Sequence, residues 1–84
     1  MRRSAIASRF FFHLYEDRVL TDEEGGEFPD AASAIMAGLA YARDIAAADV
    51  RAGHLRLSHS IRVMVQGGEE IATISFDEAV KVVP

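Results

Sequence analysis

The sequence predicts a small α+β domain, a two-layer sandwich in which one long helix packs on an antiparallel sheet of two β-hairpins (β-β-α-β-β order). Three segments predict it: an aromatic strand at 9–15, an alanine-rich helix at 31–52 and a glycine-turned hairpin at 61–76. A chain of 84 residues has room for a single core. We therefore expect one domain, residues 9–84, preceded by a flexible basic arm, residues 1–8.

Segment 9–15 reads Arg-Phe-Phe-Phe-His-Leu-Tyr and is the strongest strand signal. Alternation places Phe10, Phe12 and Leu14 on one face and Phe11, His13 and Tyr15 on the other. Since both faces are largely apolar, we expect this strand to be central in its sheet. Residues 19–21 are expected to return as a short second strand.

Residues 22–27, Asp-Glu-Glu-Gly-Gly-Glu, are too charged and glycine-rich for regular structure and are expected to form an exposed loop. Pro29 ends any strand, and Asp30 is a good N-cap for the helix that follows. The helix is expected over residues 31–52. Gly53 would end it in a left-handed conformation.

The helix carries more apolar surface than one sheet requires. At 100° per residue, one stripe is expected to face the sheet, with Met36 on one flank and Tyr41 and Ile45 on the other. The stripe comprises Ile35, Leu39, Ala42, Ala46 and Val50. The excess surface predicts a further cover, either the N-terminal arm, the C-terminal tail or the same helix of a second subunit.

The second hairpin follows an irregular segment, residues 54–59, which we expect to be an ordered loop or a short strand. Ile61, Val63 and Val65 then form an inward face, and the glycine pair at 67–68 suits a tight turn. Residues 70–76 return as the partner strand. Residues 77–80 are expected to form a last helical turn.

Charge and composition limit the classes of function. The net charge of -4 argues against nucleic acid, since phosphate contacts supply most non-specific affinity. The chain has no cysteine, which fits a reducing compartment, and Arg2 and Arg3 are not followed by the apolar run of an export signal. No stretch approaches the length that spans a bilayer. We therefore expect a soluble, cytoplasmic protein without membrane contact.

Several segments together form a pattern: the strand Phe-Phe-Phe-His-Leu at 10–14, the loop Asp-Glu-Glu-Gly at 22–25, the Phe-Pro-Asp helix start at 28–30, the pair at 43–44, the helix end at 51–53, and Phe76 with Ala79. This pattern resembles a small bacterial family known as domain of unknown function 6894. The resemblance runs from Arg9 to about Val83. It implies no particular activity. The chain departs from the pattern at Gly26, where a larger apolar residue is expected.

Few residues offer chemistry. His13 lies near the acidic loop, and an imidazole beside Asp22 or Glu24 is the usual material of an acid-base or metal site. A lone histidine between aromatics is more typical of a hydrogen-bonded structural residue. His54 and His59 share no face and are expected at the surface. The acidic loop lacks the calcium-loop order, and no phosphate loop or nucleophile triad is present. We expect no catalytic residue, metal or cofactor.

Three functions remain. The leading hypothesis is a small non-enzymatic interaction or regulatory module, a homodimer whose interface uses Met36, Tyr41 or Ile45, with another protein as an open alternative partner. The second is a nucleic-acid-associated regulator with an arginine edge formed by Arg2, Arg3, Arg9, Arg56 and Arg62. The third is a small metal-dependent hydrolase centred on His13.

Overall fold

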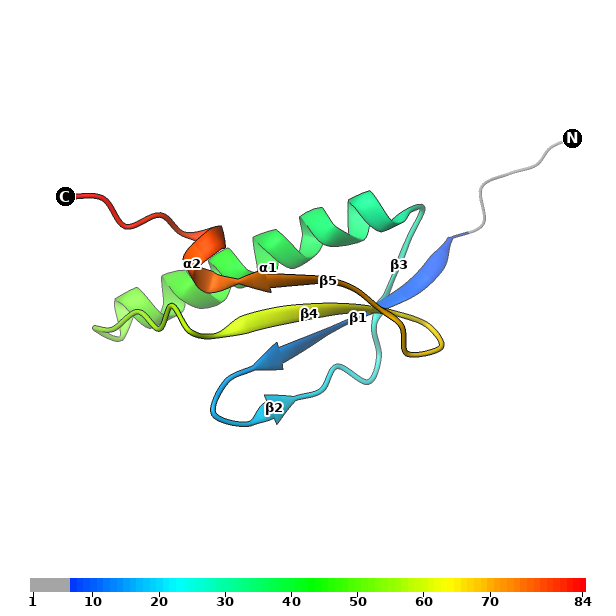
Figure 1. Ribbon diagram of the computed structural model, residues 1–84, viewed down its shortest axis with the longest axis horizontal. Helices are drawn as coiled ribbons and strands as arrows, with labels where there is room; N and C mark the ends of the chain where they lie inside the picture. Colours follow the sequence, from blue (N-terminus) through cyan, green and yellow to red (C-terminus); the bar gives the residue numbers. More distant parts are fainter. Residues whose placement is uncertain (1–6) are drawn as a thin grey trace, which may run out of the picture.

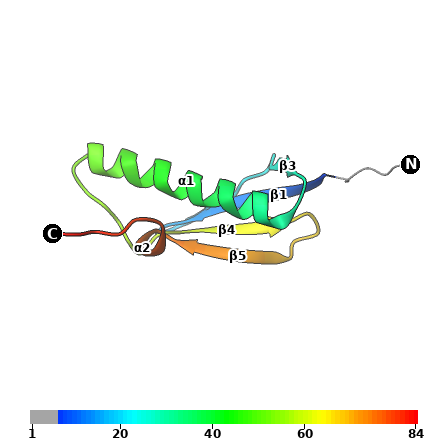
Figure 2. The same cartoon turned by 90° about the horizontal axis from the view of Figure 1, so that it is seen from above.

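The computed structural model describes residues 7–84, which form an antiparallel sheet with a long helix on one side (Figures 1 and 2). The predicted α+β class is confirmed. The elements, in chain order, are β1 (Ser8–Tyr15), β2 (Val19–Leu20), β3 (Gly26–Phe28), α1 (Ala31–Arg51), β4 (Ser60–Val65), β5 (Glu70–Ser75) and α2 (Phe76–Ala79). Of the arm predicted at 1–8, Ser8 belongs to β1, and residues 1–6, with Arg2 and Arg3, lie outside the described part.

The main path through the sheet is β2-β1-β4-β5, and β3 also pairs with β1. β1 is central, as its two apolar faces predicted: β4 pairs along one edge, and β2 and β3 share the other edge. On that shared edge β2 lies opposite residues 14–15 and β3 opposite residues 8–10. Residues 11–13 therefore face a gap between the two short strands.

The loop predicted for residues 22–27 was wrong at its end, because Gly26 and Glu27 belong to β3. Pairing with β1 uses backbone groups, so the polar and glycine-rich composition did not prevent it. Phe28 holds the strand from the core side: its ring meets those of Phe10 and Phe12 edge-on, with centroids 6.0 and 5.8 Å away.

Helix α1 begins and ends close to the predicted residues. The Asp30 carboxylate accepts a hydrogen bond from the Ser33 N–H at 2.7 Å, which caps the first turn. Ala52 is the C-cap, and Gly53 follows with a φ of 97°. Capping residues outside the apolar pattern thus set both ends of the longest element.

The face of α1 that meets the sheet differs from the predicted stripe. Its buried residues are Ala34, Gly38, Ala42 and Ala46. These small side chains repeat every four residues and let the helix backbone approach the strands closely. The larger Ile35 and Leu39 pack beside this line, and Val50, predicted to face the sheet, is 59% exposed. Close approach along the smallest residues has turned the helix so that Val50 lies on a flank.

The second hairpin is confirmed: β4 pairs with β5, Ile61 and Val63 are fully buried, and Val65 packs against the core. Its predicted last strand residue is wrong. Phe76 starts α2 instead, because Ser75 and Glu78 form a capping box that begins a helix there. The Phe76 ring is fully buried, so α2 closes one end of the core.

His59, expected at the surface, is only 5% exposed. It immediately precedes β4, where its carbonyl oxygen accepts the Phe76 N–H and its ring meets the Phe76 ring edge-on. Its Nδ1 lies 3.7 Å from a Glu16 carboxylate oxygen. Backbone pairing that continues before the first residue of β4 therefore brings this imidazole inside, while His54 stays exposed as predicted.

Candidate functional site

Asp22 organises the acidic loop against β1. One carboxylate oxygen, Oδ1, accepts the N–H groups of Gly25 at 3.0 Å and Glu24 at 3.3 Å, so the loop turns around its own aspartate. The other oxygen, Oδ2, accepts the Phe12 N–H at 3.1 Å. That N–H lies in the gap between β2 and β3. The side chain thus replaces the missing neighbouring strand.

His13 belongs to the same arrangement. Its Nδ1 accepts the backbone N–H of Asp22 at 3.0 Å, so in the neutral ring the proton lies on Nε2. The structure therefore brings His13 and Asp22 together, as the sequence suggested, but through the Asp22 backbone. Within residues 7–84, the Glu24 side chain makes no hydrogen bond or ion pair with either of them. Among residues 7–84, no three potential metal-ligating side chains come together.

Gly25 is required by space and by backbone conformation. Its φ is 69°, and a Cβ added there would lie 2.5 Å from the Phe10 carbonyl oxygen and 2.9 Å from the Phe11 ring. The loop consequently needs glycine three residues after the aspartate. The segment Asp22–Gly25 is a structural unit that fixes the loop onto β1.

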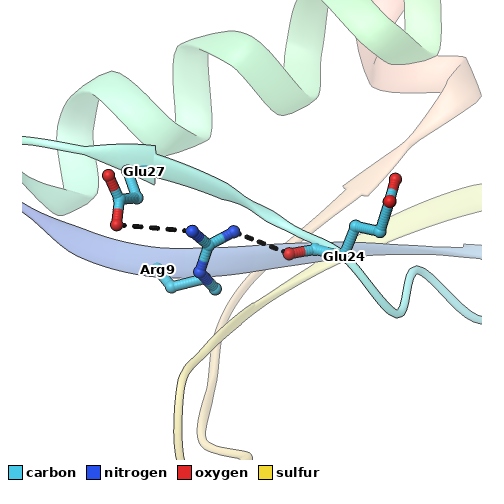
Figure 3. Close-up of polar contacts among 3 residues, drawn as sticks. All are labelled: Arg9, Glu24 and Glu27. Atoms are coloured by element: carbon cyan, nitrogen blue, oxygen red, sulfur yellow. Dashed lines mark hydrogen bonds and ion pairs between the residues drawn. The ribbon is translucent and has the colours of Figure 1, made fainter.

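Arg9, on β1, binds the end of this loop that leads into β3 (Figure 3). Its guanidinium donates to the Glu24 carbonyl oxygen at 2.7 Å and pairs with the Glu27 carboxylate at 3.3 Å. The Glu24 carboxylate points away from the guanidinium in this view. One arginine of the proposed nucleic-acid edge is therefore engaged within the protein.

The other arginines lie apart. Arg62, on β4, stacks over the Tyr15 ring at 4.0 Å and lies 3.6 Å from the Glu70 carboxylate. Arg56 is exposed in the connection between α1 and β4. The three described arginines of the proposed edge thus come from separate parts of the chain, and two of them, Arg9 and Arg62, have acidic partners.

A cleft opens on the helix side of the sheet beside this loop. It has a volume of about 380 Å³ and is lined by Phe12, Leu20, Thr21, Asp22 and Tyr41. A single helix is about 10 Å across and covers roughly two strands spaced 4.8 Å apart. Since α1 packs mainly on β4 and β5, neither helix of the described residues makes extensive contact with β2. The cleft is the space between β2 and the side of α1 that carries Tyr41, which we call the Tyr41 flank.

The cleft carries a negative charge at neutral pH. Burial raises the pKa of Asp22, but hydrogen bonds from the N–H groups of Gly25, Phe12 and Glu24, with a smaller electrostatic contribution from nearby His13, outweigh burial and hold that pKa below its usual value. These donors are neutral backbone groups, and within residues 7–84 no cation forms a salt bridge with the carboxylate. His13 does not line the cleft.

The opposite flank of α1 carries the second apolar surface. Met36 and Val50 are 64% and 59% exposed, and Arg43 lies between them with its Nε donating to the Ala79 carbonyl oxygen at 2.9 Å. A groove of about 210 Å³ runs beside Val50 and is also lined by Leu55 and Val80. We call this surface the Met36 flank.

The three residues predicted for an interface therefore lie in three environments. Met36 lies on the Met36 flank, Tyr41 is 42% exposed at the cleft, and Ile45 is half-buried against the core. Sequence reasoning missed Leu20 and Thr21 as site residues. The signal that could have found them is the apolar pair Val19–Leu20, which only Thr21 separates from Asp22.

The chain belongs to the family described as "Domain of unknown function (DUF6894)", because the model of that family matches residues 9–77. The family assignment predicted from the segment pattern is thereby confirmed. The matched residues include β1 from Arg9 onward, the Asp22–Gly25 loop, α1 and the second hairpin. Comparisons with curated proteins and with solved structures returned no match. The structure contains no helix, within its described residues, that is both long and apolar enough to cross a membrane.

Proposed function

We propose that this protein is a small non-enzymatic interaction module that self-associates through the Met36 flank of α1. The observation that supports this proposal is that two large apolar side chains of α1, Met36 and Val50, are exposed. They lie fourteen residues apart, with Arg43 midway, and a seven-residue spacing keeps all three near one line of a helix. Large apolar side chains exposed in a row on a helix are typical of a protein interface.

The neighbouring apolar groups support a second copy as the partner. Val82 and Val83 follow α2 and are 65% and 67% exposed, close in the chain to Val80, which lines the groove beside Val50. A two-fold axis near this flank would place the exposed valines of each copy against the groove of the other. Burying one valine contributes about 1.5 to 3 kcal/mol, and association costs about 4 to 15 kcal/mol, so we expect a weak dimer.

Light scattering across a concentration series tests the proposal. We expect the mass to rise toward twice the monomer mass at high protein concentration. Val50→Glu and Met36→Glu each introduce a residue of good helix propensity that places a charge on the flank, so each variant should stay folded and monomeric. Ala48→Glu, an exposed change away from this flank, is the matched control and should still associate. A monomeric wild-type protein at high concentration refutes self-association.

The proposal includes the location of the protein, which we take to be the cytoplasm of a bacterium. The family resemblance and the absence of cysteine from the sequence support this location. The arginine-edge alternative has less support, because Arg9 and Arg62 each have a glutamate partner. The hydrolase alternative has less support still, since His13 Nδ1 and both Asp22 oxygens accept backbone hydrogen bonds. A low-salt gel shift and metal analysis of purified protein test these two alternatives.

A further inference from the structure

We propose that the cleft between β2 and the Tyr41 flank of α1 is a binding site for an arginine side chain from a partner protein. This inference does not depend on self-association, which uses the opposite flank of the helix. It rests on three observations: the aromatic residues that line the cleft, the Asp22 carboxylate that lines it with them, and the way this protein already binds its own arginines.

The walls suit a flat cation. Two of the lining residues, Phe12 and Tyr41, are aromatic and a third, Leu20, is aliphatic, and Leu20 and Tyr41 are 41% and 42% exposed. A guanidinium is planar and weakly hydrated, so it stacks on aromatic faces at a smaller desolvation cost than an ammonium. The volume of about 380 Å³ leaves room for a side chain to enter from solvent.

The charge selects a cation over a neutral group. Asp22 lines the cleft as a half-buried carboxylate, and its three hydrogen-bond donors are backbone N–H groups that carry no net charge. A carboxylate has about four acceptor positions, which leaves one for an incoming donor. Glu23, an exposed acid next to Asp22 in the chain, adds to the negative potential.

The protein itself shows both halves of this recognition. Arg62 lies 4.0 Å above the ring centroid of Tyr15, which is the stacking contact. Arg9 donates to the Glu24 carbonyl oxygen in the acidic loop and pairs with the Glu27 carboxylate in β3, which is the polar contact (Figure 3). The cleft offers an aromatic ring and a carboxylate together without an arginine from the described residues.

Titration of the labelled full chain with the blocked peptide acetyl-Gly-Arg-Gly-amide, followed by NMR, tests the proposal. The amide signals of Thr21, Asp22 and Tyr41 should shift, and added salt should reduce the effect. The matched control peptide replaces arginine by citrulline, which has nearly the same shape and no charge. Equal shifts with both peptides, or none at millimolar concentration, overturn the proposal.

Variants locate the site on the protein. Tyr41→Ala removes an exposed ring and should weaken binding of the arginine peptide about two- to fivefold, the range expected for an exposed cation–π contact. Tyr41→Phe should restore it. Leu57→Ala, an exposed apolar change in the connection between α1 and β4, is the control and should leave binding unchanged. Unchanged binding by Tyr41→Ala would move the peptide elsewhere and refute the cleft as its site.

The chain's own arm is the competing occupant, because Arg2 and Arg3 carry the same chemistry. An Arg2→Gln, Arg3→Gln double variant distinguishes the two sources. If the arm fills the cleft, the double variant will bind the peptide more tightly than the wild type does, and the partner proposal fails. Equal affinity in both proteins supports an arginine from another molecule. Light scattering of the same samples reports self-association separately.

Discussion

The Asp22 carboxylate accepts the Phe12 N–H at the point where β1 lacks a neighbouring strand. This hydrogen bond, at 3.1 Å, connects the acidic loop to the centre of the sheet. Because the same side chain also turns the loop around Gly25 and lines the cleft, one residue couples local folding to the candidate binding site.

Replacing Asp22 should therefore destabilise the fold. In Asp22→Ala the N–H groups of Phe12 and Gly25 lose their acceptor, and we expect a loss of about 1 to 3 kcal/mol in the free energy of unfolding. Urea denaturation measures it. Glu23→Gln, an exposed change in the same loop, should lie within about 0.5 kcal/mol of wild type. Equal stability of Asp22→Ala and wild type would show that the loop is not held by this carboxylate.

The Asp22 contribution should depend on pH. Its folded pKa lies below its unfolded value of about 3.9, so its stabilisation is fully present above that pH. It is lost as the pH falls through the folded pKa, because both states are then protonated. The stability difference between wild type and Asp22→Asn should be large at neutral pH and should shrink in acid. A difference that is constant with pH contradicts an ionised carboxylate.

Gly25→Ala should cost more than Gly53→Ala. Both glycines have a positive φ, which costs a non-glycine residue about 1 to 2 kcal/mol. A Cβ at Gly53 would meet nothing within 4 Å, whereas a Cβ at Gly25 would clash with a backbone oxygen that cannot move aside. We expect the midpoint of thermal unfolding to fall further for Gly25→Ala. The reverse order would mean that the loop moves away from β1.

Gly38→Ala sets helix propensity against packing. Alanine gains about 1 kcal/mol over glycine within a helix, but its Cβ would lie 2.9 Å from Ile74 Cδ1 and 3.1 Å from Val63 Cγ2. Overpacking of this kind costs about 1 to 3 kcal/mol, so we expect net destabilisation. Ile74→Val removes the closest atom. The loss of unfolding free energy in the double variant should therefore be smaller than the sum of the losses in the two single variants. A double-mutant cycle measures this difference.

Much of the fold followed from local patterns. The aromatic strand, the Asp30 cap, the helix and the glycine turn each depend on neighbours in the chain, and each lies where it was expected within a residue or two. The misplaced features involve distant partners. β3 exists because β1 offers it an edge, and His59 is buried because its backbone pairs with Phe76.

The candidate site was only partly predictable for the same reason. His13 and Asp22 were singled out, yet the direction of their hydrogen bond depends on the gap between β2 and β3. The cleft depends on which strands the helix covers. Tyr41 was expected on a helix flank, but its neighbours Leu20 and Thr21 come from a part of the chain about twenty residues away.

The sequence by itself determined the α+β class, the family, the helix and its cap, because periodicity, turn residues and capping act over a few residues. Tertiary structure alone decided which side of α1 faces the sheet, where the acidic loop is fastened and where a cleft remains. The physical reason is that the helix settles where its smallest side chains allow the closest approach. That position depends on the volumes of residues such as Ile74 and Val63, which pack against it from the sheet.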